Sequence, residues 1–280
     1  MNLPFTVGLS PTLGFRGIIA TEDIPANTIV ERCPLLFIPT ADEESLKKTI
    51  LWKYYYEWTK KLYCIVLGYG SLVNHSYTPS AKYIFDYRRK SLLFKTIKAI
   101  KKGEEITVNY NCDPENKEAL PEMLLDNNKH VVSQESITFV QEKGISLPFV
   151  IGESPTLGIR GLLATRRIPK GEIFEYCPVV LFPVEQEEFM NKTVLGNYYF
   201  EWDKTHCAFA FGYGGLINHK QQPNVYFSLS APHLAVIFQA LEDIAPGEEL
   251  FINYNGYEAD KDKPVDLGYI DFDHHQKKFR

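Results

Sequence analysis

The chain has 280 residues, of which 45% are hydrophobic, 14% aromatic and 23% charged. This composition excludes an intrinsically disordered chain and allows either one large domain or two ordinary ones. Thirty Lys and Arg against 35 Asp and Glu give a net charge of −5, which argues against a general nucleic-acid-coating protein and suits a basic partner. No apolar run approaches the ~18 residues that span a bilayer, and the N-terminal stretch lacks the pattern of a signal peptide, so no membrane association is expected.

The five cysteines are odd in number and widely spaced, and no two of them form a Cys-x-x-Cys pair. This spacing suits neither a zinc knuckle nor a disulfide framework. We therefore expect no metal site and a reduced, intracellular protein, in the cytoplasm or the nucleus.

The sequence contains an internal repeat as long as a domain, since its first segment recurs in the second half of the chain. The segment SPTLGFRGIIATEDIP starts at Ser10, and SPTLGIRGLLATRRIP starts at Ser154, 144 residues later. The register continues without a gap to Asn111 and Asn255, with about 45 identities in about 110 positions. A repeat of this length is too long to be a solenoid unit. The sequence therefore predicts the same domain twice.

Within each copy, β-branched and aromatic residues between turns predict short strands, and one segment predicts a helix. The elements, with their copy-two counterparts in parentheses, are a strand at 28–38 (172–182), a helix at 42–58 (185–202), hairpins at 82–85 and 92–97 (224–229 and 234–241) and a strand at 106–109 (250–253). The expected fold is mainly β with one helical insertion per copy. The basic run 88–90 falls on a hairpin tip and is interpreted as a solvated turn, so no direct nucleic-acid binding is expected.

The repeat sets the expected boundaries: copy one at 1–113, a linker at 114–144, copy two at 145–257 and a C-terminal tail at 258–280. In the linker, Asp113 as N-cap and Pro114 in the first turn predict a short helix through Leu125, and residues 136–140 have a β-like pattern. Because the linker is poor in Gly and Ser, we expect the two copies to pack on each other as a pseudo-dimer rather than to behave as independent domains.

Three motifs recur in the same order in both copies: GFRG and GIRG, then GYGSLVNH and GYGGLINH, then GEEITVNY and GEELFINY. Each motif alone also fits an ordinary turn, a core histidine or a core aromatic residue. Together, in this order and spacing, they resemble the SET-domain family of protein-lysine methyltransferases. The resemblance covers both copies and is greatest to compact SET domains, including virus-encoded ones. The zinc-binding cysteines that follow the SET domain in other branches are absent from this sequence.

The resemblance implies a fold of small β-sheets with knot-like C-terminal threading, and methyl transfer from S-adenosylmethionine to a lysine of a histone or another basic protein. The cofactor-binding residues that it implies are Arg16, Gly17, Asn74 and His75 in copy one and Arg160, Gly161, Asn218 and His219 in copy two. The implied catalytic residues are Tyr110 and Tyr254 at the transfer point, and Tyr55, Tyr199 and Tyr257 along the lysine channel. In-line methyl transfer needs a neutral amine and alignment, which an aromatic channel can provide without a metal or a catalytic triad.

Each copy departs from the family pattern, in which Ser follows Asn-His and Pro-Asn comes shortly after. Copy one has Ser76 but Ser80 after proline, and copy two has Asn224 after proline but Lys220 after Asn-His. Copy two also has Tyr257 and a tail with Tyr269 and Phe272, which favours it as the working site. The alternative is a tandem SET module in which one or both copies bind a lysine-rich peptide without turnover.

Overall fold

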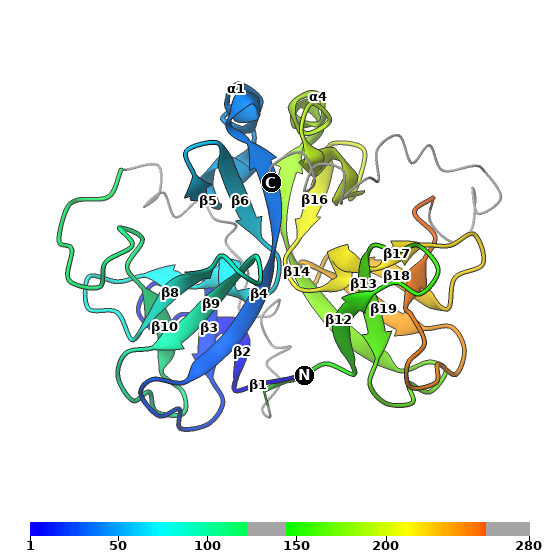
Figure 1. Ribbon diagram of the computed structural model, residues 1–280, viewed down its shortest axis with the longest axis horizontal. Helices are drawn as coiled ribbons and strands as arrows, with labels where there is room; N and C mark the ends of the chain where they lie inside the picture. The colour runs from blue at the N-terminus through cyan, green and yellow to red at the C-terminus, as the bar shows by residue number, and fades with distance from the viewer. Residues whose placement is uncertain (122–143, 256–280) are drawn as a thin grey trace.

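The computed structural model describes residues 1–121 and 144–255, which form two similarly built halves side by side (Figure 1). The elements of copy one are β1 (Asn2–Leu3), β2 (Phe5–Leu9), β3 (Arg16–Ala20), β4 (Ile29–Pro39), η1 (Thr40–Asp42), α1 (Glu43–Leu46), η2 (Ile50–Lys53), β5 (Tyr55–Thr59), β6 (Leu62–Val66), η3 (Tyr69–Leu72), β7 (Asn74–His75), β8 (Ala81–Asp86), β9 (Ser91–Thr96) and β10 (Glu105–Val108).

The elements of copy two follow in the same order. They are β11 (Ile145–Ser146), β12 (Phe149–Glu153), β13 (Arg160–Ala164), β14 (Ile173–Pro183), η4 (Val184–Gln186), α4 (Glu187–Met190), η5 (Val194–Asn197), β15 (Tyr199–Glu201), β16 (His206–Ala210), η6 (Gly214–Leu216), β17 (Asn218–His219), β18 (Val225–Ser230), β19 (Ala235–Ala240) and β20 (Phe251–Ile252). The prediction of a mainly β fold that is duplicated in tandem, with a small helix in each copy, is confirmed.

Each copy is built on a five-stranded antiparallel sheet, in the order β5-β6-β4-β9-β8 in copy one and β15-β16-β14-β19-β18 in copy two. The long strand β4 pairs with β9 through its first half and with β6 through its second half. An irregularity between Ile29 and Glu31 shifts the register of β4, and Ile173 and Glu175 do the same in β14. Both predicted hairpins are present as β8–β9 and β18–β19.

The last strand of each copy returns beside the Asn-His pair. In copy one, β10 lies between β3, with which it is antiparallel, and β7, with which it is parallel. In copy two, β20 pairs with β17 in the same parallel way. Because parallel neighbours need a long connection, the whole β8–β9 hairpin intervenes before β10 inserts between β3 and β7. The insertion of β10 agrees with the threading expected for the family.

The predicted helices at 42–58 and 185–202 are wrong as continuous helices. Only α1 and α4 are α-helical, four residues each, and 3-10 turns flank them. The helix is interrupted at Thr49, which is extended (φ −114°, ψ 156°) and donates its hydroxyl to the Leu46 carbonyl at 2.8 Å. The aromatic run that follows forms β5, in which Tyr55 stacks on Trp52 at 4.2 Å, because aromatic residues favour strands.

The predicted linker helix is wrong over residues 114–121, which form a turn and then irregular chain, and the remainder of it lies outside the described residues. Side chains compete with helical hydrogen bonds here. The Asp113 carboxylate accepts from the Glu115 amide at 3.0 Å, and the side-chain amides of Asn109 and Asn111 donate to the carbonyls of residues 116 and 118 at 2.6 and 2.7 Å. The β-like piece at 136–140 and the tail are also outside the described residues.

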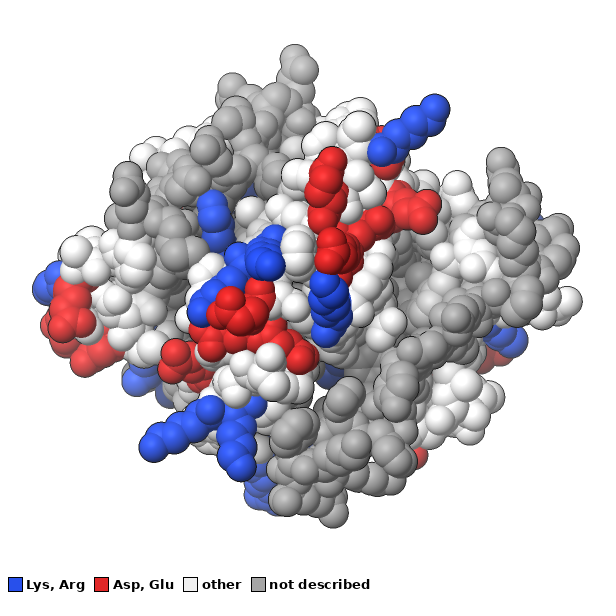
Figure 2. All heavy atoms as spheres, turned by 90° about the horizontal axis from the view of Figure 1, so that it is seen from above, with Lys and Arg blue, Asp and Glu red and all other residues white. Residues whose placement is uncertain are grey.

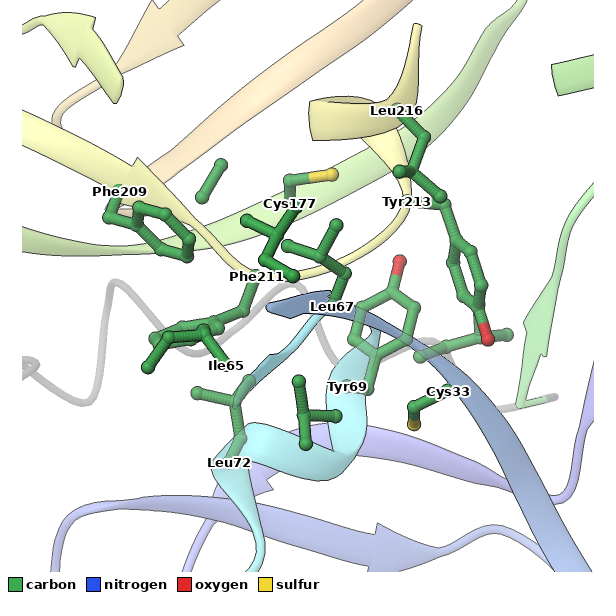
Figure 3. Close-up of a cluster of buried hydrophobic side chains, with 14 of the residues drawn as sticks. Cys33, Ile65, Leu67, Tyr69, Leu72, Cys177, Phe209, Phe211, Tyr213 and Leu216 are labelled. Carbon is green, nitrogen blue, oxygen red and sulfur yellow. The ribbon is translucent and has the colours of Figure 1, made fainter. Parts of the chain in front are cut away.

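The two copies pack on each other, as expected. Gly68 and Gly212 exchange backbone hydrogen bonds at 3.0 and 3.2 Å. The Tyr69 hydroxyl donates to Glu175 at 3.2 Å, and the Tyr213 hydroxyl donates to Glu31 at 2.9 Å. Such reciprocal contacts are typical of an approximate two-fold axis. Figure 3 shows both tyrosines within one apolar cluster drawn from both copies.

The face that carries α1 and α4 displays charges of both signs (Figure 2). Lys47, just after α1, pairs with Glu43 at 2.7 Å, and Lys192, just after α4, pairs with Glu188 at 2.6 Å. These exposed pairs contribute little to stability. Within residues 1–121 and 144–255, no helix is long and apolar enough to cross a membrane.

Candidate functional site

Each copy has a small pocket beside its Asn-His pair. The copy-one pocket is lined by Phe15, Arg16, Tyr54, Ser71, Leu72, Val73, Asn74 and Tyr110. The copy-two pocket is lined by Arg160, Asn197, Tyr198, Gly215, Leu216, Asn218 and Tyr254. Six of the positions correspond at the 144-residue shift, so the repeat has preserved a pocket as well as a fold.

Strand pairing brings the predicted histidine and tyrosine together. In copy one, the parallel pairing of β10 with β7 places Tyr110 just beyond His75. The Tyr110 amide donates to His75 Nδ1 at 3.1 Å, and the Tyr110 hydroxyl donates to the Val73 carbonyl at 2.8 Å. Tyr110 is therefore held at its backbone amide and at its hydroxyl, next to the strand that carries Asn74.

Copy two repeats this arrangement. The Tyr254 amide donates to His219 Nδ1 at 3.1 Å, and the Tyr254 hydroxyl donates to the Ile217 carbonyl at 3.0 Å. Burial raises the pKa of both Tyr110 and Tyr254 above the usual value, so both phenols keep their protons at neutral pH. Burial also lowers the pKa of His219, which favours the neutral imidazole that accepts from the tyrosine amide.

The predicted asparagines are held by a carboxylate that the sequence interpretation missed. Asn74 Nδ2 donates to Glu105 at 2.7 Å and to the Arg16 carbonyl at 3.1 Å, and Glu105 also accepts from the Ser10 hydroxyl at 2.5 Å. In copy two, Asn218, Glu249 and Ser154 make the same contacts. The available signal was the second Glu of Gly-Glu-Glu and the Ser of Ser-Pro-Thr, since both occur in both copies.

The second glycine of each turn makes room for this carboxylate–amide pair. A Cβ on Gly17 would lie 2.7 Å from Asn74 Nδ2 and even closer to Glu105, and Gly161 meets the corresponding atoms of copy two. The first glycines, Gly14 and Gly158, have φ of +71° and +66°, a conformation that glycine adopts at low cost. Each turn therefore needs both glycines for different physical reasons.

The predicted arginines lie in the pockets but extend to the other copy. The Arg16 guanidinium donates through Nη2 to the Val179 carbonyl on β14 at 2.9 Å, and Arg160 donates to the Leu35 carbonyl on β4 at 3.2 Å. Burial lowers the pKa of Arg16, and the neighbouring Tyr54 acts in the opposite direction. Arg16 Nη1 is buried and has no hydrogen-bond partner among the described residues.

Two of the expected channel tyrosines, Tyr55 and Tyr199, do not line the pockets, whereas the residues directly before them do. Tyr54 and Tyr198 are pocket residues, whereas Tyr55 packs on Trp52 and Tyr199 donates to Asn191 at 3.3 Å. Tyr257 lies outside the described residues. Tyr54 and Tyr198 end the 3-10 turns directly before β5 and β15, so the residue at which each strand begins decides which tyrosine reaches the pocket.

The departures from the family pattern leave the local backbone unchanged. The amides of Ser76 and Lys220 both donate to the neighbouring strand at 2.9 Å, and Lys220 places its amine 5.2 Å from the centre of the Phe251 ring. Ser80 bridges β10 by accepting from the Thr107 amide and donating to the Glu105 carbonyl. Asn224 bridges β20 in the same way, since a hydroxyl and an amide can both donate and accept.

Within the described residues, no group of three or more His, Cys, Asp or Glu is placed to hold a metal ion. Each pocket brings together a tyrosine hydroxyl, a carboxylate-held amide, a guanidinium and a glycine turn.

The threaded last strand and the paired Asn-His and Asn-Tyr segments define a SET domain. The chain belongs to this family, because the SET domain profile matches residues 15–111 and 159–255. It is also similar to a protein of Schizosaccharomyces pombe that is named histone-lysine N-methyltransferase, H3 lysine-37 specific. The identity is 33% over 114 residues, which are 40% of this chain and 77% of the relative.

Solved structures of similar proteins each match about one copy. A candidate histone methyltransferase of Plasmodium falciparum is 30% identical, with a TM-score of 0.34, over 39% of this chain and 95% of the other. A humanized mutant of the Chaetomium thermophilum Polycomb Repressive Complex 2, bound to the inhibitor GSK126, is 22% identical, with a TM-score of 0.36, over 42% of this chain and 16% of the other.

Proposed function

We propose that the protein transfers a methyl group from S-adenosylmethionine to a lysine side chain of a protein substrate. The observation that carries this proposal is the pocket tyrosine of each copy, Tyr110 or Tyr254, which is fixed by a histidine and a backbone carbonyl beside a carboxylate-held asparagine. The same construction occurs twice in a chain of the SET family. Both copies are therefore assigned the same chemistry, although Tyr257 and the tail first favoured copy two.

The pocket residues fit the proposed cofactor. The free Nη1 of Arg16 is a buried cationic donor, which suits the carboxylate of the methionine part, and Phe15 and Tyr54 offer apolar surface to the remainder. We assign cofactor binding to Arg16, Gly17, Asn74 and His75, and to Arg160, Gly161, Asn218 and His219 in copy two. When bound, the cofactor supplies an activated methyl group on a sulfonium.

The protein's contribution is desolvation and alignment. An aromatic wall lowers the pKa of an incoming lysine, because it disfavours the charged ammonium. Tyr110 and Tyr254 keep their protons, and their oxygens can accept weak C–H···O contacts. Holding the amine in line with the methyl group lowers the entropic part of the barrier. We retain Tyr55 and Tyr199 as proposed residues of the outer part of the lysine channel. Tyr257, which lies outside the described residues, stays a proposed channel residue.

We further propose a basic protein as the substrate. The net charge of −5 favours encounter with a lysine-rich peptide, and the S. pombe relative is named for a lysine of histone H3. The domain division into 1–113, 114–144, 145–257 and 258–280 remains our proposal.

Methyl transfer from labelled S-adenosylmethionine to histone H3 and other basic proteins tests the function. We expect Tyr110→Phe with Tyr254→Phe to lower the rate at least about tenfold, the equivalent of one hydrogen bond of about 1.4 kcal/mol. Tyr87→Phe, on an exposed turn, is the matched control and should behave as wild type.

Labelling of no substrate by the wild type, together with tight cofactor binding, would support the alternative of a peptide-binding SET module. Absence of both labelling and cofactor binding would contradict the proposal.

A further inference from the structure

One wall of the copy-one pocket is supported from behind by copy two. Tyr54 lines this pocket, and its ring lies 4.9 Å from the ring of Phe211, with an angle of 41° between the planes. Phe211 immediately precedes Gly212, where the two copies exchange backbone hydrogen bonds. Figure 3 shows Phe211 beside Leu67 and Ile65 of copy one, inside the shared cluster.

A second contact connects the same pocket to copy two. The Arg16 guanidinium is anchored on the Val179 carbonyl of β14, while the Arg16 carbonyl accepts from Asn74. One residue therefore joins the central strand of copy two to the asparagine of copy one. Arg160 makes the reciprocal connection from Leu35 to Asn218.

We infer that each copy positions the pocket of the other, and that Phe211 is a positioning residue for the copy-one site although it belongs to copy two. This inference rests on the proposed function, since it concerns binding of the proposed cofactor. Phe211 acts through Tyr54: the ring contact holds Tyr54 against the pocket, and aromatic pairs of this kind contribute beyond the area they bury.

The repeat provides the substitution that tests this role. The position of copy one that corresponds to Phe211 is Leu67, 144 residues earlier, and it is equally buried. Phe211→Leu thus installs a residue that the fold already accepts at the equivalent position, and it removes the ring that meets Tyr54. Phe209 is a fully buried ring on β16, with its ring 5.5 Å from Phe211, so Phe209→Leu is a matched control for lost aromatic volume.

The experiment measures S-adenosylhomocysteine binding to the full chain by calorimetry, with one site disabled at a time. In an Asn218→Ala background only copy one binds, and we expect Phe211→Leu to weaken binding about two- to tenfold, the range of one aromatic pair. In an Asn74→Ala background only copy two binds, and we expect Phe211→Leu to leave the affinity unchanged. Phe209→Leu should change neither affinity.

In the chain without background substitutions, Phe211→Leu should leave one site with weakened affinity and one site with wild-type affinity. This measurement tests the inference even if a background variant does not fold. Unchanged copy-one binding, or weakening confined to copy two, would overturn the inference while the proposed function stands. If the folded wild type binds no cofactor product at all, the proposed function fails and the inference fails with it.

Discussion

At the residue scale, the carboxylates of Glu105 and Glu249 organise the two sites. Glu105 accepts from Asn74 and Ser10 at 2.7 and 2.5 Å, and both donors are buried. We expect Glu105→Ala to destabilise the fold by about 1–3 kcal/mol, because two buried donors, on Asn74 and Ser10, lose their shared carboxylate acceptor. It should also weaken cofactor binding by copy one, since Asn74 loses its orientation. Urea unfolding and calorimetry measure the two effects.

The adjacent Glu104 provides the control for this prediction. It is exposed, and its carboxylate accepts only from the Lys101 amide among the hydrogen bonds described for it, at 2.7 Å. Glu104→Ala should therefore leave copy-one cofactor binding intact. Equal effects of the two substitutions on that binding would show that Glu105 does not orient Asn74.

Residue types at the site were predictable where a short motif carries them. The Asn-His and Asn-Tyr pairs, and the turn glycines, meet in space as their order in the sequence suggested. The choice of Tyr54 over Tyr55 was not predictable, because it depends on how β5 begins after an irregular 3-10 turn. The role of Glu105 was hidden because a charged residue after a Gly turn is usually solvated.

At the element scale, residues 113–121 form a segment that side chains, rather than helical hydrogen bonds, hold against copy one. Asn111 Nδ2 donates to the carbonyl of Glu118 at 2.7 Å, the Leu120 amide donates to the Tyr77 hydroxyl at 3.2 Å, and Leu120 is only 7% exposed. We expect Asn111→Ala to accelerate tryptic cleavage after Lys117 several-fold, because one of the ties that close this segment is lost.

The repeat again supplies the control. Asn255 is the copy-two counterpart of Asn111, so Asn255→Ala should leave cleavage after Lys117 at the wild-type rate. If Asn111→Ala behaves in the same way, the hydrogen bond to Glu118 does not hold the segment.

Strands were predicted well and helices poorly, for a physical reason. The hairpins and the long strand have β-branched and aromatic residues bounded by turns, and strand pairing over six residues confirms the pattern. The segments at 42–58 and 185–202 combine an acidic start, typical of helices, with an aromatic end that favours strands. Tertiary pairing of β5 with β6 decides the outcome, which local propensity cannot do.

At the scale of the whole molecule, the interface contains two buried carboxyls in crossed contacts. Glu31 accepts from the Tyr69 amide of its own copy and the Tyr213 hydroxyl of the other, and Glu175 accepts from the Tyr213 amide and the Tyr69 hydroxyl. The repeat predicted that the copies pack, but not that these identical residues pair across the axis. That pairing follows from the Gly68–Gly212 crossing, where a Cβ on either glycine would press on the neighbouring Glu or Cys.

These carboxyls make stability depend on pH in an unusual direction. Burial, assisted by repulsion from Glu31, raises the pKa of Glu175 to about 7, from a usual value near 4.5, although hydrogen bonds oppose the shift. Burial also raises the pKa of Glu31. The folded chain therefore binds more protons than the unfolded chain between about pH 4.5 and about 7, so the contribution of Glu175 to the unfolding free energy falls as pH rises through this window.

Glu175→Gln should remove this fall, because glutamine cannot ionise, while its Oε1 can still accept from the Tyr213 amide and the Tyr69 hydroxyl. Relative to wild type, the variant should gain stability on going from about pH 5 to about pH 8, by at most about 3 kcal/mol. Urea unfolding at several pH values measures the difference.

Glu201→Gln, at an exposed position on β15, should follow the wild-type slope. A Glu175→Gln slope that matches wild type would mean that Glu175 is already ionised at the interface near pH 5, and that the Tyr69 and Tyr213 contacts stabilise the buried anion.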